Sequence, residues 1–139
     1  MPERLRTITR RLREFIGNRR RAPRRRLRLA VAVSLLDAGG SAHPATLSGH
    51  TRDVSESGLG VVLPAIRVGE RYLVGEGHTL RVILKLPEAH ARLYGTPVRY
   101  ERLEADQPDT GYLVGIRLTE TADEDYAAFA EYLRTIEKR

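Results

Sequence analysis

Residues 27–35 have the sequence L-R-L-A-V-A-V-S-L, in which a large apolar side chain alternates with a small or charged one. A period of two puts every second side chain on the same face of a β-strand. The segment therefore predicts a strand with one buried face, formed by Leu27, Leu29, Val31, Val33 and Leu35.

Five further strands are predicted downstream, at about 46–53, 58–63, 79–86, 92–103 and 111–118. Segments rich in turn-forming residues separate them, at 37–44, 68–70 and 106–109. Short strands without intervening helices are typical of an antiparallel barrel or sandwich. We favour an all-β, six-stranded antiparallel barrel over residues 27–118, because closure leaves no exposed strand edges.

Both ends of the chain predict helices. A C-terminal helix over 122–137 follows from the capping-box spacing of Thr121 and Glu124 and from an apolar stripe. Residues 1–18 predict an amphipathic basic helix, whose apolar stripe consists of Leu5, Ile8, Leu12 and Phe15. Between this helix and the barrel, Pro23 disfavours helical structure, so residues 19–26 (R-R-R-A-P-R-R-R) predict an exposed, extended arm.

The positive charge of the chain is concentrated at its N-terminus. Residues 1–28 contain 12 arginines, Glu3 and Glu14, a balance of +10, and the rest contains 24 − 12 = 12 basic and 18 − 2 = 16 acidic residues, a balance of −4. A basic segment on a mildly acidic body is typical of proteins that meet phosphate, nucleic acid or anionic lipid. A genomic preference for arginine would explain the excess over lysine, but not the clustering.

Several classes of protein are not supported by the sequence. There is no cysteine, which excludes disulfides, thiolate metal sites and a cysteine nucleophile. The four histidines lack the spacing of metal ligands, and no catalytic motif occurs. No apolar run reaches the length of about 20 residues that spans a membrane. We therefore expect a soluble, cytoplasmic protein that is not an enzyme and needs no metal or cofactor.

Two short motifs stand on either side of the first predicted strands. Arg20 and Arg24 form R-x-x-x-R on the arm, and Asp53, Ser55 and Gly58 form D-x-S-x-x-G between two strands. In this order the motifs resemble the PilZ domain family, bacterial receptors for cyclic di-GMP. The resemblance covers about residues 19–136 and implies a barrel with a terminal helix, so we delimit the domain as 19–139. It assigns these five residues to the ligand site.

The chemistry of the same residues agrees with that ligand. Cyclic di-GMP presents two phosphates and two guanines, which require cations, donors to guanine O6 and N7, and an acceptor for guanine N1 and N2. Arg20 and Arg24, about 13 Å apart in an extended arm, supply cations and donors. Asp53 supplies the acceptor, Ser55 can donate or accept, and Gly58 permits close backbone approach.

Arg19 precedes the first motif arginine, and family resemblance implies that an arginine there can contact a second ligand, giving two cyclic di-GMP molecules per chain. Two other arginine pairs have the same spacing, Arg21 with Arg25 and Arg24 with Arg28. We choose Arg20 and Arg24 because a proline directly before the second arginine matches the family's usual pattern.

Each motif also has a purely structural interpretation. Residues 53–58 can be a tight turn with Gly58 at positive φ, and the arginine run can be a solvated tail. The principal functional hypothesis is an adaptor whose arm orders on binding the messenger and alters contact with a protein partner. The alternative is a small barrel that binds nucleic acid through its arm. Residues 3–17 could contact a membrane surface, a partner or a second copy in a homodimer.

Overall fold

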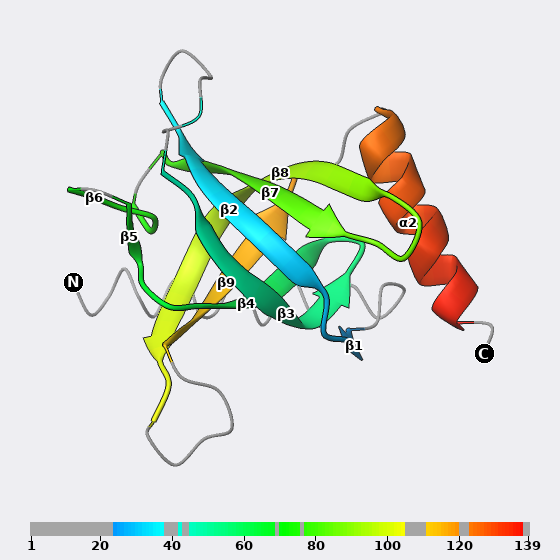
Figure 1. Ribbon diagram of the computed structural model, residues 1–139, viewed down its shortest axis with the longest axis horizontal. Helices are drawn as coiled ribbons and strands as arrows, with labels where there is room; N and C mark the ends of the chain where they lie inside the picture. The colour runs from blue at the N-terminus through cyan, green and yellow to red at the C-terminus, as the bar shows by residue number, and fades with distance from the viewer. Residues whose placement is uncertain are drawn as a thin grey trace.

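The computed structural model describes residues 24–37, 42, 45–68, 70–75, 77–104, 111–119 and 123–137. Its centre is a closed antiparallel barrel of six strands: β2 (Ala30–Leu36), β3 (Leu47–Ser55), β4 (Gly58–Leu63), β7 (Thr79–Lys85), β8 (His90–Arg102) and β9 (Tyr112–Leu118). The strands pair in the order β3-β2-β7-β8-β9-β4, and β4 pairs with β3 to close the barrel (Figure 1). The predicted six-stranded barrel is confirmed.

The barrel is filled by the alternating apolar side chains that predicted its strands. Along β2 the buried side chains include Val31, Val33 and Leu35, and on β7 they are Leu80, Val82 and Leu84. Leu27 and Leu29, before β2, are partly buried and pack against this core. One apolar face per strand is therefore enough to specify which side of the sheet faces inward.

The first strand is interrupted, which differs from the continuous strand predicted over residues 27–35. β1 (Arg25–Arg26) pairs with β3 so that Arg26 lies opposite Asp53, whereas Ala30 of β2 lies opposite His50. Three residues on one strand thus face two on the other, a β-bulge. The buried Thr51 hydroxyl bridges the bulge, accepting from the Leu29 N–H at 2.8 Å and donating to the Leu27 carbonyl. This hydroxyl stabilises the path from β1 into the barrel.

Thr51→Val is therefore expected to lower the free energy of unfolding by about 1–3 kcal/mol, because it keeps the volume but leaves two backbone groups without their partner. Urea unfolding followed by far-ultraviolet circular dichroism measures the change. Thr51→Ser, which retains the hydroxyl, is the matched control and should lose less. A valine variant as stable as the parent would show that the hydroxyl does not stabilise the bulge.

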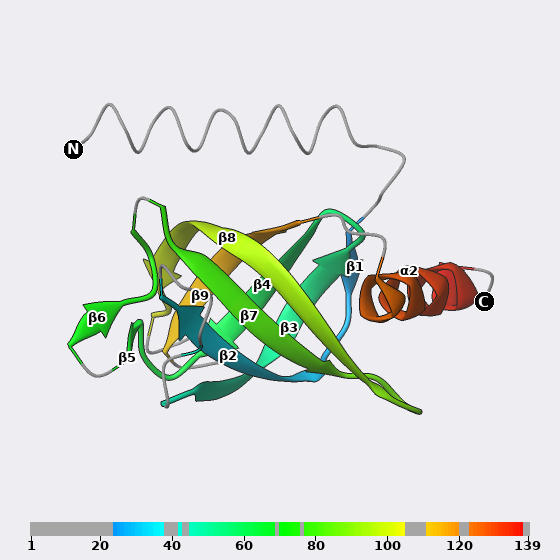
Figure 2. The same ribbon diagram turned by 90° about the horizontal axis from the view of Figure 1, so that it is seen from above.

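The C-terminal helix α2 (Glu124–Glu137) lies at one end of the barrel and packs mainly against β8 (Figure 2). Phe129, fully buried, and Leu133 face the core. The N-terminal cap is Asp123, whose Oδ1 accepts from the Tyr126 N–H at 2.8 Å. Thr121, in the predicted capping box, lies outside the described residues. The predicted helix is confirmed, with its start two residues later than expected.

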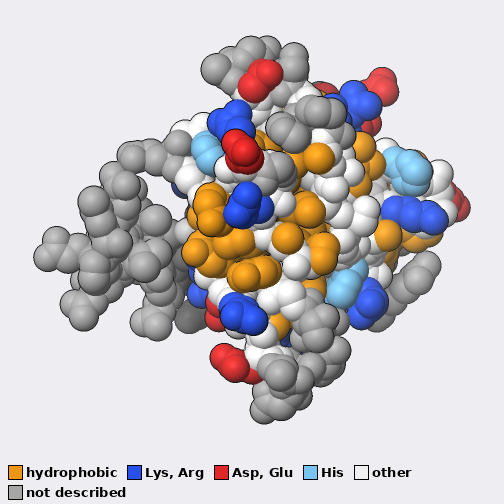
Figure 3. Space-filling model, turned by 60° about the vertical axis from the view of Figure 1, so that its left-hand side comes forward, with side chains coloured by type: hydrophobic (Ala, Val, Ile, Leu, Met, Phe, Trp, Pro, Cys, Tyr) orange, Lys and Arg blue, Asp and Glu red, His pale blue; other side chains and the backbone are white. Residues whose placement is uncertain are grey.

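A second, small sheet was not predicted. Strands β5 (Arg67–Val68) and β6 (Arg71–Tyr72) form a hairpin where the sequence predicted only a turn. The hairpin and α2 lie at opposite ends of the barrel (Figures 1 and 2). Its side of the molecule carries a patch of hydrophobic side chains with charged groups around it (Figure 3). Tyr72 is exposed and receives the Arg67 guanidinium over its ring, 5.6 Å from the centroid.

The predicted basic helix at 1–18 and the first part of the arm, residues 19–23, lie outside the described part of the chain. Within the described ranges, α2 is too short and too polar to traverse a lipid bilayer, and no other helix there could do so.

Candidate ligand-binding site

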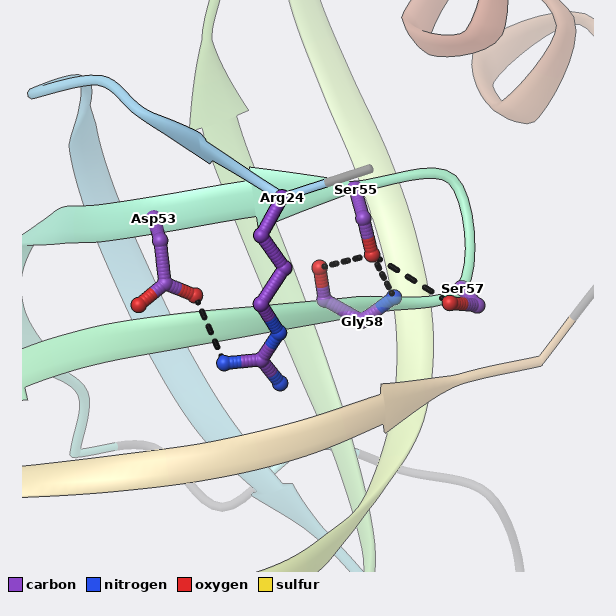
Figure 4. A network of polar contacts seen from close by, with 5 residues as sticks. All are labelled: Arg24, Asp53, Ser55, Ser57 and Gly58. Carbon is purple, nitrogen blue, oxygen red and sulfur yellow. Dashed lines mark hydrogen bonds and ion pairs between the residues drawn. The ribbon is translucent and has the colours of Figure 1, made fainter. Parts of the chain in front are cut away.

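The D-x-S-x-x-G motif forms the tight connection between β3 and β4. Ser55 and Gly58 are paired across it, and the Ser55 hydroxyl accepts from the Gly58 N–H at 3.1 Å. The same hydroxyl lies 3.2 Å from both the Gly58 carbonyl and the Ser57 hydroxyl (Figure 4). With 3% of its surface exposed, Ser55 holds the shape of the turn from within.

A tight turn with Gly58 at positive φ was one expectation from the sequence. The structure gives a different reason for a glycine at this position. The described glycines with positive φ are Gly77 and Gly111, so Gly58 has an ordinary backbone conformation. A Cβ at Gly58 would instead lie 2.9 Å from the Ile116 carbonyl oxygen of β9. Within this chain, a neighbouring strand thus approaches Gly58 closely, and the approach of a ligand to Gly58 stays a prediction.

The turn is also tied to the C-terminal helix. The Tyr126 hydroxyl of α2 donates to the Glu56 carbonyl at 3.0 Å, and Arg134 lies 4.0 Å from the Glu56 carboxylate. From the other side, the Leu118 N–H at the end of β9 donates to the Ser57 carbonyl at 2.9 Å. A displacement of the turn would therefore alter the contacts between the turn and α2.

The arm and the turn motif meet at an ion pair. Arg24 Nη1 donates to Asp53 Oδ1 at 3.0 Å, with 35% of the arginine side chain and 19% of the aspartate side chain exposed. The arginine side chain extends across β4, and its guanidinium lies beside the Asp53 carboxylate (Figure 4). Asp53 in turn lies over Gly60, where a Cβ would come within 2.9 Å of Oδ1. Gly60 has no recognisable signal in the sequence, because its role depends on a contact between two strands.

The second arginines of the two alternative pairs, Arg25 and Arg28, do not face Asp53 as Arg24 does. Arg25 pairs with Val54, whose side chain is buried in the core, so Arg25 is directed to the opposite face of the strand from Asp53. Arg28 lies within the bulge and is exposed. Among Arg24, Arg25 and Arg28, the guanidinium that pairs with Asp53 is that of Arg24. Arg19 and Arg20 lie outside the described residues.

The site therefore combines a cation with many donors and a carboxylate with a second oxygen, both partly open to solvent. No cluster of acidic and histidine side chains that could hold a metal occurs among the described residues. Such a pair recognises a ligand that carries both anionic and hydrogen-bond-donating groups. A guanine nucleotide has both.

A closed six-stranded barrel, a C-terminal helix and Arg24 paired with the aspartate of a D-x-S-x-x-G turn together have the features of a small-ligand-binding PilZ-type domain. The chain belongs to the PilZ domain family, whose model matches residues 18–135. This is a family of cyclic di-GMP receptors, and the match indicates no catalytic family.

The fold is also similar to that of a solved structure, the inhibitor of motility MotI/DgrA from Bacillus subtilis. The TM-score is 0.58 at 20% sequence identity, and the match covers 87% of this chain and 53% of the other. This chain thus spans about half the length of that protein. The comparison with curated proteins found no match.

Proposed function

We propose that this chain binds cyclic di-GMP at the junction of arm and turn and acts as an adaptor, without making or degrading the messenger. The observation that supports the proposal best is the meeting of Arg24 with Asp53, 29 positions apart in sequence, at 3.0 Å over β4. Both side chains keep part of their surface in solvent, so a ligand can reach them.

After forming the ion pair, Asp53 still has an acceptor oxygen and Arg24 still has N–H donors for a ligand. Asp53 Oδ1 accepts from Arg24, and Oδ2 can accept from guanine N1 and N2. Arg24 uses Nη1 in that pair, so its other donors can take a phosphate or guanine acceptor. Arg20 would add the second motif cation. Ser55 and Gly58, already engaged inside the turn, would position the turn backbone for the ligand.

The proposed adaptor role depends on the two segments that adjoin the site, the arm and α2. We propose that the messenger orders the arm of residues 19–26 and thereby reorients the preceding helix of residues 1–18 toward a protein partner in the bacterial cytoplasm. Domain limits of 19–139, a second ligand at Arg19, a homodimer, and a membrane-surface contact through residues 3–17 are further elements of this hypothesis. The hydrogen bond from Tyr126 to Glu56 offers a second route, from the turn to α2.

Calorimetric titration of the full chain with cyclic di-GMP tests the proposal. We expect a dissociation constant at or below the micromolar range, and two ligands per chain if Arg19 holds a second molecule. A one-to-one endpoint would exclude the second ligand alone. Tighter, steeply salt-dependent binding of RNA or DNA, with no response to cyclic di-GMP, would favour the nucleic-acid alternative instead.

A further inference from the structure

A row of four paired residues crosses the barrel wall beside the proposed site. Asp53 of β3 pairs with Gly60 of β4, Gly60 pairs with Gly115 of β9, and Gly115 pairs with Arg99 of β8. Residues that pair directly across antiparallel strands carry their side chains on the same face of the sheet. Asp53 and Arg99 therefore stand on one face, at the two ends of a row whose middle consists of glycines.

A β-bulge occurs at each end of this row. Relative to β4, the register of β3 shifts between Thr51 and Asp53, and relative to β9, that of β8 shifts between Pro97 and Arg99. Bulges redirect the side chains beside them and are common next to functional sites. Here the two bulges adjoin Asp53 and Arg99, the charged residues of the row.

The glycines allow both charged side chains to lie over the neighbouring strands. A Cβ at Gly60 would be 2.9 Å from Asp53 Oδ1, and a Cβ at Gly115 would be 3.3 Å from Arg99 Cγ. Asp53 thus leans over β4 and Arg99 leans over β9, each toward the other. The backbones of β3 and β8 are at most about 14 Å apart, three strand spacings, so both side chains are within reach of one planar ligand lying along the row.

No described residue competes with a ligand for the Arg99 guanidinium. The residue is partly exposed, and among the described residues it forms no hydrogen bond or ion pair. Arg24 reaches the same region from the opposite side, across β4 (Figure 4). An acceptor at one end of the row and a fork of donors at the other match the two edges of guanine, which donates from N1 and N2 and accepts at O6 and N7.

We propose that Arg99 donates to the O6 and N7 edge of the guanine whose N1 and N2 are read by Asp53, and so contributes to guanine specificity. This inference rests on the proposed function. Arg99→Ala is expected to weaken cyclic di-GMP binding roughly tenfold, the loss of one charge-assisted hydrogen-bonding group. Arg99→Lys, which keeps the charge but loses the fork, is expected to fall between Arg99→Ala and the parent.

Calorimetric titrations with cyclic di-GMP and with its inosine analogue test this role. The analogue lacks the N2 amine but retains O6 and N7, so Arg99→Ala should weaken both ligands by the same factor, whereas Asp53→Ala should cost less with the inosine ligand. The matched control is Arg102→Ala, which removes an exposed arginine from the same strand and should change affinity less than twofold.

Each result separates this inference from the proposed function. A parent chain that ignores cyclic di-GMP overturns both. A parent that binds, with Arg99→Ala equal to Arg102→Ala, overturns only the role of Arg99. A loss with cyclic di-GMP that disappears with the inosine ligand also overturns it, because the contact would not be to O6 and N7. Unchanged thermal unfolding of the variants excludes misfolding as the cause.

Discussion

Asp53→Ala is expected to weaken cyclic di-GMP binding by about a hundredfold or more. The substitution removes the acceptor for guanine N1 and N2, and each charge-assisted hydrogen bond contributes about 1.5–3 kcal/mol. A hundredfold loss corresponds to about 2.8 kcal/mol. It also removes the partner that positions the Arg24 guanidinium, 3.0 Å away. Arg24→Ala should cause a loss of similar size, because the ligand then meets the carboxylate without its compensating cation.

Neither substitution should unfold the barrel. The pair is partly open to solvent, so its contribution to stability is under about 1 kcal/mol. Calorimetry gives the affinities, and thermal unfolding reports the integrity of the fold. Glu101→Ala, which removes an exposed carboxylate from β8, is the matched control and should bind like the parent. Full affinity in both site variants would place the ligand elsewhere.

Phe129→Ala is expected to have the largest effect on stability, lowering the free energy of unfolding by about 3–5 kcal/mol. Phe129 is fully buried on α2 and packs edge-to-face with Tyr126, with 6.4 Å between ring centroids. Truncation leaves a cavity between the helix and the barrel. Because Tyr126 holds the Glu56 carbonyl, loosening the helix should also weaken ligand binding.

Chemical denaturation of Phe129→Ala beside Glu131→Ala measures this effect. Glu131 lies on the same helix, is exposed, and pairs with Arg134 at 2.9 Å, a surface ion pair worth under about 1 kcal/mol. The two variants should therefore differ by several kcal/mol. Similar unfolding free energies would mean that α2 contributes little to the stability of the barrel.

Local pattern was enough to predict the six barrel strands and the C-terminal helix. Each strand buries one face, so an alternating sequence such as residues 27–35 carries its own signal. The bulge before β2 left no such signal, since Leu27 and Leu29 continue the alternation and the bridging hydroxyl comes from Thr51 on another strand. The β5–β6 hairpin was missed because two-residue strands are too short to show a period.

The site was predictable only in part, for a related reason. The motif spacing predicts Arg20, Arg24, Asp53, Ser55 and Gly58 as ligand contacts, which stays a prediction, and among the described residues the structure brings Arg24 to Asp53. The spacing did not indicate that Ser55 is enclosed in the turn, nor that Gly58 adjoins the Ile116 carbonyl. Arg99, the further guanine contact that we propose, could not be predicted from sequence, because its relation to Asp53 depends on the register of four strands.

Nuclear magnetic resonance of the isotope-labelled chain, titrated with cyclic di-GMP, tests binding and location together. If Arg24 and Asp53 hold the ligand, the Arg24 side-chain Nε–H signal and the backbone amide signals of residues 53–58 will shift in a saturable manner, while those of the β5–β6 hairpin at the far end of the barrel stay in place. Signals at the arm and turn that remain unchanged at saturating ligand would contradict the account.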